Sequence, residues 1–407
     1  MSNYCSTLES PQTDNSVIPG RMEVRVFRSD GELEAIRDLW TSLQAHPNID
    51  YEYYQLIHRS RRQIIRPHVV VAYRAGVPET LVIGRIEQVK ISVGIGYAKL
   101  ASLSAKRLTL IHGGVLGNCS SENCQAIFES IERALRDGEA DLATLSYLST
   151  DCPLVRHAIE KRNLLSRQQP LLTQSHRVMS LPMRSDELYE RFSVKVRKNL
   201  KWQMRKLEKD HNGELAIRCF STCAELDSMF RDIEAVARNT YQRGLGAGFE
   251  DNPEMRARME LLAQQDQLRA YILYIHQQPS AFWVGSVYRN VLHSNFMGFD
   301  RTYARYSPGM YLILRVLEQL CNSAPNPAVR SIDFGLGDAQ YKKLLSDLEW
   351  TEASISVFAP SLRGLRLMLL QTPLAILNNF SQRILAQAGL LQKVKTLWRG
   401  RLPQHSL

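Results

Sequence analysis

Val24-Arg25-Val26-Phe27 has a counterpart later in the chain, Ile217-Arg218-Cys219-Phe220. In both places a short alternating stretch, typical of a strand, is followed by an amphipathic stretch, typical of a helix, over residues 32–43 and 224–237. Because both elements recur in the same order, we expect the chain to contain two copies of one structural plan.

A second match supports the duplication. Residues 68–73 and 80–86 have the pattern of two strands joined by a turn that ends in proline, and residues 269–275 and 281–288 repeat it. The second strand of each pair contains one internal glycine, Gly84 in the first copy and Gly285 in the second.

The chain continues alike after both pairs. The first copy predicts a strand at 107–111, a glycine-rich loop at 112–117, a helix at 121–136 and a strand at 143–147. The second copy predicts a strand at 292–297, a helix at 308–321 and a strand at 331–334. Strands alternating with helices predict an α/β fold, here a mixed sheet with helices on both faces in each of two tandem domains.

These patterns also predict the domain limits. Residues 1–20 form a flexible polar tail, 21–183 the N-terminal domain, 184–360 the C-terminal domain and 361–407 a helical extension. A helix over 186–210 is placed at the start of the C-terminal domain.

Composition narrows the protein class. The chain has 407 residues, of which 44% are hydrophobic and 23% charged, as in ordinary globular proteins. Its start lacks the pattern of a signal peptide, and no apolar run has the roughly 18 residues needed to cross a bilayer. The seven cysteines are scattered, with no Cys-x-x-Cys pair. We therefore expect a cytoplasmic protein with reduced thiols and no metal site.

The first candidate site lies in the stretch Asp300 to Leu314. Ser307 fits the N-cap of a helix and Pro308 its first position. The free N–H groups of a helix start attract anions, and Gly309 would let a phosphate approach the backbone closely. Arg301 and Arg305 could add charge-assisted contacts. A capped helix without a ligand has the same residues, so this alternative stays open.

The second candidate site is Ile332 to Lys343, which includes Asp-Phe-Gly-Leu-Gly-Asp. Asp333 falls at the end of a predicted strand, and Asp338 could cap a following helix with Tyr341 and Lys342. Ligands of open α/β sheets bind at such strand ends. A glycine turn with a capping aspartate is the alternative.

Three further segments have distinctive compositions. Residues 239–248 contain three glycines in five positions, typical either of a loop that closes over a substrate or of a plain linker. The helix Arg191 to Lys209 has eight basic residues, which could bind a phosphate or an acidic polymer or simply face water. Residues 361–407 have seven Lys and Arg and no acid; the segment could lie on an anionic membrane or pack against protein.

Residues 191–360 resemble the acyltransferases of cellulose biosynthesis in the GNAT superfamily. The resemblance lies in the basic helix, the loop from Tyr241 to Gly246, the Tyr306-Ser307-Pro308-Gly309 stretch and the segment from Asp333 to Lys342. The duplicated layout is similar to that of the peptidoglycan-bridge aminoacyl transferases. The chain lacks the full Gln/Arg-x-x-Gly-x-Gly/Ala loop of typical GNAT enzymes.

The resemblance implies an acyltransferase that uses acyl-CoA, most simply acetyl-CoA, on a sugar, polysaccharide or cell-envelope precursor. A carrier protein or an aminoacyl-tRNA would be the alternative donor. It implies Asp333, Asp338 or His293 as the general base and Tyr341 as the acid. The donor would contact Arg305, Tyr306, Ser307, Pro308, Gly309, Met310 and Lys342, and the acceptor Tyr241, Arg243 and Asp300.

Two other functions remain open at this stage. One is a non-catalytic accessory protein that binds an acidic polymer or the inner membrane surface through its basic segments. The other is an aminoacyl-tRNA-dependent transferase. A glycan or small-molecule acceptor, peripheral membrane contact and a homo-oligomer are the expected partners of the leading reading, and nucleic acid is not among them.

Overall fold

The computed structural model describes residues 22–95, 98–160, 171–240, 243, 248–322 and 329–370. These fall into two compact units. Unit 1 comprises residues 1–174 and 351–391, and unit 2 comprises 175–350 and 392–407. Unit 1 therefore takes its final strand from the chain that follows unit 2. The division after Gln174 lies a few residues before the domain limit expected from the sequence.

Unit 1 is built on a sheet in the order β1-β3-β4-β5-β6-β13, with β2 paired to β4. Its strands are β1 (Met22–Phe27), β2 (Ile64–Pro67), β3 (Val69–Arg74), β4 (Val77–Ile95), β5 (Ala98–Gly117), β6 (Leu142–Ser149) and the unit 1 part of β13 (Leu348–Phe358). Its helices are α1 (Asp30–Glu34), α2 (Arg37–Leu43), the 3-10 turn Pro47–Ile49, α3 (Tyr51–Ser60), α4 (Ser121–Arg136) and α5 (Pro153–Glu160). Residues 362–370 are also helical.

Unit 2 repeats this order with β8-β9-β10-β11-β12-β7. Its strands are β7 (Leu172–Ser180), β8 (Leu215–Phe220), β9 (Leu268–Ile275), β10 (Gln278–Tyr288), β11 (Val291–Phe299) and β12 (Ser331–Leu336). Its helices are α6 (Ser185–Glu190), α7 (Val194–Asp210), α8 (Leu226–Ala237), α10 (Pro253–Gln264), α11 (Pro308–Cys321) and α12 (Gln340–Leu345), with 3-10 turns at Cys223–Glu225 and Arg301–Tyr306.

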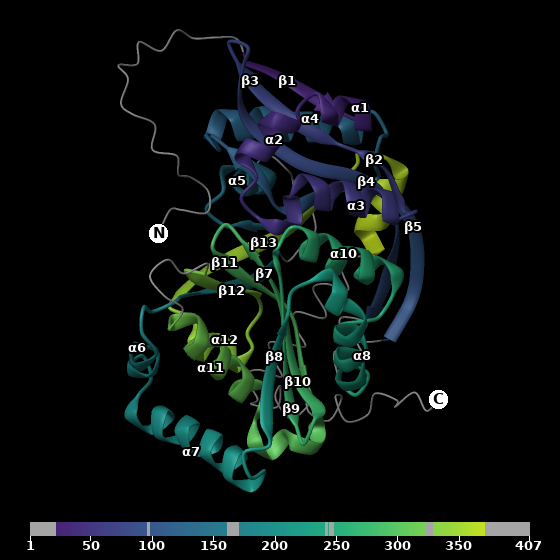
Figure 1. Ribbon diagram of the computed structural model, residues 1–407. Helices are drawn as coiled ribbons and strands as arrows, with labels where there is room; N and C mark the ends of the chain where they lie inside the picture. The colour runs from purple at the N-terminus through teal and green to yellow at the C-terminus, as the bar shows by residue number, and fades with distance from the viewer. Residues whose placement is uncertain are drawn as a thin grey trace, which may run out of the picture. The chain divides into compact units, whose positions relative to one another are not determined.

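Helices cover both faces of each sheet, which confirms the expected α/β class. In unit 2, α6, α7 and α11 pack on one face around Trp283 and Leu292, and α8 and α10 pack on the other around Phe230 and Ile272. Figure 1 shows α11 and α8 on opposite sides of strands β9 and β10. In unit 1, α4 and α5 cover one face and α1 to α3 the other. Each sheet thus gains its stability from two apolar layers.

The duplication is confirmed by the equivalent strand orders of the two units. In each unit one strand of the parallel pair, β6 or β12, also pairs with an antiparallel neighbour from a distant part of the chain, β13 or β7. The helix expected at 308–321 has those limits, and the helix expected at 121–136 also begins and ends as predicted.

Three local predictions are wrong. The helix expected at 32–43 is two helices, because α1 ends at Glu34 and α2 starts anew at Arg37. The helix expected at 186–210 is also interrupted, because the Ser193 side chain accepts a hydrogen bond from the Val196 amide and starts α7 there. The loop expected at 112–117 belongs to the long strand β5.

Among the described residues, no helix is both long and apolar enough to span a membrane. Most of the basic extension at 361–407 lies outside the described residues. Its described start, 362–370, contributes Leu367 and Met368 to a small apolar cluster with Phe358 of β13.

Candidate active site

Strands β11 and β12 run parallel only at their beginnings. Their register pairs Val291–His293 with Ser331–Asp333, and His293 opposite Asp333 is the last pair. Beyond it β11 continues along β10 as far as Phe299, while β12 continues along β7. The two strands therefore diverge directly after His293 and Asp333. Ligands of open α/β sheets occupy such openings at strand ends.

Asp333 holds two histidines at this point. Its carboxylate lies 2.8 Å from Nε2 of His176, on β7, and 3.2 Å from Nδ1 of His293. The amide of Gly335 donates a third hydrogen bond at 2.7 Å. Burial by itself would raise the pKa of Asp333, but the contacts with the two histidines outweigh it and hold the pKa well below its usual value. Asp333 is thus a buried anion that orients two imidazoles.

The surrounding contacts fix this group in place. The indole of Trp350 stacks on the His176 ring, with centroids 4.4 Å apart and planes 12° from parallel. The ammonium of Lys342 donates to the carbonyl oxygens of Phe334 and Leu336 at 2.5 and 2.7 Å. Burial lowers the pKa of Lys342. Lys342 therefore stabilises the end of β12 through these two hydrogen bonds, and its ammonium is engaged by the protein itself.

A β-bulge lies beside His293. The register of β10 and β11 moves from Val284 opposite Phe296 to Gly285 opposite Ser294, so Asn295 is an extra residue on β11. A bulged residue leaves the regular ladder of hydrogen bonds. A Cβ added to Gly285 would lie 2.8 Å from the His293 carbonyl oxygen, so only glycine fits there. The bulge thus takes Asn295 out of the regular pairing of β11 with β10, two residues after His293.

Helix α11 begins close to the same strand. Ser307 has the left-handed conformation at the N-cap and its side chain makes no capping hydrogen bond, contrary to the sequence-based expectation, while Pro308 occupies the first position as predicted. A Cβ added to Gly309 would meet the end of the Phe299 side chain at an ordinary contact distance of 3.5 Å. The N–H groups of the first turn are therefore not capped by Ser307, which suits an anion from outside.

The remaining predicted donor contacts surround this helix start. Tyr306 is buried and donates to Asp210, while the exposed Arg305 donates to the Tyr306 hydroxyl at 2.6 Å. Met310 packs against the core cluster of unit 2. The structure therefore brings residues 305–310 together at one place and puts Lys342 in a different role.

The other predicted catalytic residues do not join the histidine pair. Asp338 does not cap a helix, since Ala339 is the N-cap of α12; it lies 3.2 Å from Lys343 and 3.5 Å from Arg177. Partial burial would raise the pKa of Asp338, but Lys343 and Arg177 lower it, which makes Asp338 a poor base. Tyr341 packs edge-on against Phe334, the neighbour of Asp333.

The predicted acceptor residues lie at other positions. Asp300 accepts a hydrogen bond from the Thr302 amide and starts the 3-10 turn before α11. Arg243 binds Glu234 at 2.9 Å and the Phe249 carbonyl oxygen at 2.6 Å, so it closes the ends of its loop. Tyr241 and Gly244–Ala247 lie outside the described residues.

The sequence analysis missed His176 and Asn295. His176 is 157 positions from Asp333 along the chain, in a segment without any motif. The internal Gly285 was a usable signal for the bulge, because a glycine within a strand pattern indicates one.

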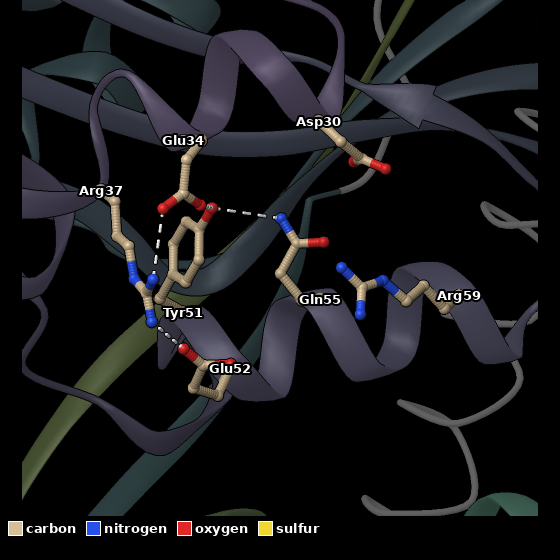
Figure 2. A pocket seen from close by; sticks show the side chains of 7 residues that line it. All are labelled: Asp30, Glu34, Arg37, Tyr51, Glu52, Gln55 and Arg59. Atoms are coloured by element: carbon tan, nitrogen blue, oxygen red, sulfur yellow. Dashed lines mark hydrogen bonds and ion pairs between the residues drawn. The ribbon is translucent and has the colours of Figure 1, made fainter.

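Unit 1 contains a polar surface pocket of about 280 Å³ between α1 to α3. Figure 2 shows Arg37 between Glu34 and Glu52, with Gln55 directed at Tyr51. Arg37 pairs with Glu34 and Glu52, and no serine, cysteine or histidine lines the pocket.

Comparisons with known proteins match the part of the chain that contains these residues. Residues 194–343 match the family described as the acetyltransferase (GNAT) domain. Unit 2 thus contains a GNAT acyltransferase domain. The match begins at α7 and ends in α12, so it includes β11, α11 and β12. The expectation of a GNAT-type transferase is confirmed, and members of this superfamily use acyl-CoA in general. No curated protein matches the chain.

Solved structures similar to the chain include FemX, at 9% identity and a TM-score of 0.51, covering 81% of this chain and 96% of that one. A tandem GNAT protein from the clavulanic acid pathway has 10% identity and a TM-score of 0.47, covering 84% and 99%. The C-terminal domain of a lysylphosphatidylglycerol synthetase from Agrobacterium fabrum has 11% identity and a TM-score of 0.44, covering 72% and 84%. At these identities the FemX likeness bears on the fold alone.

Proposed function

We propose that the protein transfers an acyl group from acyl-CoA to an amine or hydroxyl of a sugar, polysaccharide or other cell-envelope precursor, with the chemistry in unit 2. The observation that carries this proposal is the His293–Asp333–His176 group at the point where β11 and β12 diverge. A buried carboxylate that orients an imidazole is the arrangement that a general base needs at neutral pH.

His293 acts as the base in this proposal. Asp333 lies 3.2 Å from Nδ1, and in this proposal the other ring nitrogen, Nε2, takes the proton from the acceptor. As that proton leaves, the acceptor nitrogen or oxygen forms a bond to the thioester carbon. The anionic Asp333 stabilises the imidazolium that results, which is a positioning and electrostatic role.

Backbone groups of the Asn295 bulge serve the developing negative charge on the carbonyl oxygen. An amide outside the regular ladder can donate to an oxyanion without losing a strand hydrogen bond. Collapse of the tetrahedral species breaks the carbon–sulfur bond, and Tyr341 gives its phenolic proton to the thiolate. His293 then loses its proton to water, and Tyr341 regains one from water, which restores both residues.

The start of α11 is the proposed contact for the donor's phosphates. Support comes from the left-handed Ser307, from the missing side-chain cap and from the small Gly309. Arg305, being exposed, adds positive charge at that end. Lys342 has no part in donor binding here, because its ammonium binds two strand carbonyls.

The acceptor class rests on the resemblance to acyltransferases of cellulose biosynthesis and on the basic extension after Ser361. A cytoplasmic reaction close to the inner membrane fits both. The N-terminal unit would then serve as scaffold or acceptor contact, with the domain limits proposed above.

The test is thiol release from acetyl-CoA in the presence of a panel of amino sugars, nucleotide sugars and polysaccharide fragments. We expect release that depends on one acceptor class and that is lost in His293→Ala. If no acceptor in the panel stimulates thiol release and the protein does not bind acetyl-CoA, the proposal is wrong.

A further inference from the structure

Helix α7 displays a continuous basic stripe that the acyl-transfer site does not use. Lys195, Lys198, Trp202, Arg205 and Lys209 are spaced alternately three and four residues apart, so they lie on one face of the helix. All five are exposed, and Trp202 is 57% exposed. The stripe extends over roughly 21 Å at 1.5 Å per residue.

The opposite face of α7 holds the helix to unit 2. Leu200, Met204 and Leu207 are its buried residues, and all three belong to the core cluster around Trp283. Glu208 also binds Arg315 and Tyr311 of α11. With the apolar face and Glu208 engaged, the stripe lies on the side of α7 that faces away from the core of unit 2.

The charges of the stripe do not serve the helix itself. No acidic residue lies in the first turn of α7, where an acid would favour the helix dipole, and Lys195 is placed there instead. Helices α1, α4, α8 and α10 each have an acid in the first turn. Like charges three and four apart also repel. Among the described residues, no ion pair is recorded for Lys195, Lys198, Arg205 or Lys209.

We propose that this stripe docks unit 2 on a bilayer rich in anionic phospholipid. A straight row of cations on a convex helix fits a flat anionic surface, and clusters of four or more Lys and Arg on one helix favour such lipids. Trp202 in the middle of the row and Val194, 58% exposed at its end, are suited to the headgroup level.

The geometry fits a bilayer better than a nucleic acid. Bases stack on open aromatic faces, whereas the Lys206 ammonium already lies 5.1 Å from the centre of the Trp202 ring. The exposed side chain of Val194 is apolar and makes no favourable contact with the phosphates of a nucleic acid. Docking is independent of the proposed chemistry, so either can fail without the other.

Vesicle co-sedimentation with the full chain tests the proposal. We expect the protein to pellet with vesicles of mixed phosphatidylcholine and phosphatidylglycerol and not with phosphatidylcholine alone, with binding that weakens as salt rises. Lys198→Glu/Arg205→Glu should weaken binding at least about tenfold, since each basic residue contributes roughly fivefold at such a surface. The matched control is Arg231→Glu/Arg238→Glu, which makes the same charge change. Arg231 lies on α8 and Arg238 is its C-cap, both are exposed, and this variant should bind like the wild type.

A second measurement covers the case in which the double variant does not fold. Trp202→Phe is a mild change, and in a Trp398→Phe background it should remove most of the quenching of tryptophan fluorescence by brominated lipids, because Trp40 and Trp283 are fully buried and Trp350 stacks on His176. Vesicle binding equal in both double variants would overturn the proposal. So would loss of polyuridylate binding in Lys198→Glu/Arg205→Glu with vesicle binding unchanged.

Discussion

The two units differ most at the equivalent point of their sheets. In unit 2, Gly285 pairs with Ser294, and the residue before Ser294 is His293. His293 pairs in parallel with Asp333, which also binds His176. In unit 1, Gly84 pairs with Leu110, and the residue before Leu110 is Thr109. Thr109 pairs in parallel with Thr144, whose hydroxyl lies 3.2 Å from that of Ser356. The same backbone plan thus carries hydroxyls in one copy and a base with its carboxylate in the other.

The helix that follows shows the same difference. In unit 1 the Ser120 side chain caps α4 by accepting from the Asn123 amide, whereas Ser307 gives α11 no such cap. A helix start that satisfies itself gains stability, and one that does not is available to a ligand. This difference supports the proposal that one copy serves as a scaffold and the other carries the chemistry.

The largest expected effect is the difference in kcat between the His293→Ala and Thr109→Ala variants. His293→Ala should lower kcat about 10²- to 10⁴-fold, because a positioned base contributes that much. Thr109→Ala, the same truncation at the equivalent position, should leave activity within about twofold of wild type after correction for folded protein. Steady-state kinetics with the acceptor identified from the panel checks both. Equal losses in the two variants would remove the functional difference between the units.

Asp333→Asn should reduce kcat by a smaller factor, about 10²-fold, because the amide still occupies the space but no longer stabilises a positive imidazole. Steady-state kinetics with the same acceptor measures the loss. A kcat within about twofold of wild type, after correction for folded protein, would show that Asp333 serves only the fold.

Acid should affect unit 1 before unit 2. Burial lowers the pKa of His68, in unit 1, to about 4, so the unfolded chain takes up a proton near pH 6.5 that the native protein refuses. The free energy of unfolding should therefore fall by up to about 3 kcal/mol between about pH 6.5 and 4. Asp333 acts in a lower pH range. Because its pKa is lowered in the folded protein, the stability that it contributes is present above about pH 4 and is lost below it.

Urea unfolding as a function of pH measures this dependence. His68→Gln should flatten the curve between about pH 6.5 and 4. A wild-type curve that is level over this range contradicts the account of His68.

The smallest effects concern the two helix starts. Ser120→Ala should lower the free energy of unfolding by about 1 kcal/mol, the usual value of an N-cap. Ser307→Ala should cost clearly less, because there is no side-chain cap to lose. Matched denaturation curves decide this, and an equal cost at both positions would mean that α11 is capped in solution.

Much of the fold followed from local patterns. The helix at 308–321 had a proline at its first position and a continuous apolar face, and its limits were predicted correctly. Asp333 and His293 were both candidates because each falls on a predicted strand of the second copy. Their pairing could not be predicted, because it depends on the parallel register of β11 and β12, which a single sequence does not encode locally.

The breaks and extensions of elements were harder to foresee. Ser193 could have indicated the start of α7, since serine is a good N-cap, but the basic periodicity on both sides concealed it. Strand β5 continues through Gly113 and Gly114, where glycines suggested a loop, because close neighbours such as the Ile83 carbonyl leave no room for a Cβ at Gly114. At Gly114 tertiary packing overrode the local signal, whereas at Ser193 the local signal was correct.

Calorimetric titration with acetyl-CoA tests the central claim, that only unit 2 retains a donor site. We predict one binding event per chain, which Gly309→Asp abolishes by placing a carboxylate at the start of α11, while Glu122→Gly in the first turn of α4 leaves it intact. No binding by the wild-type protein, or unchanged binding by Gly309→Asp, would contradict the account.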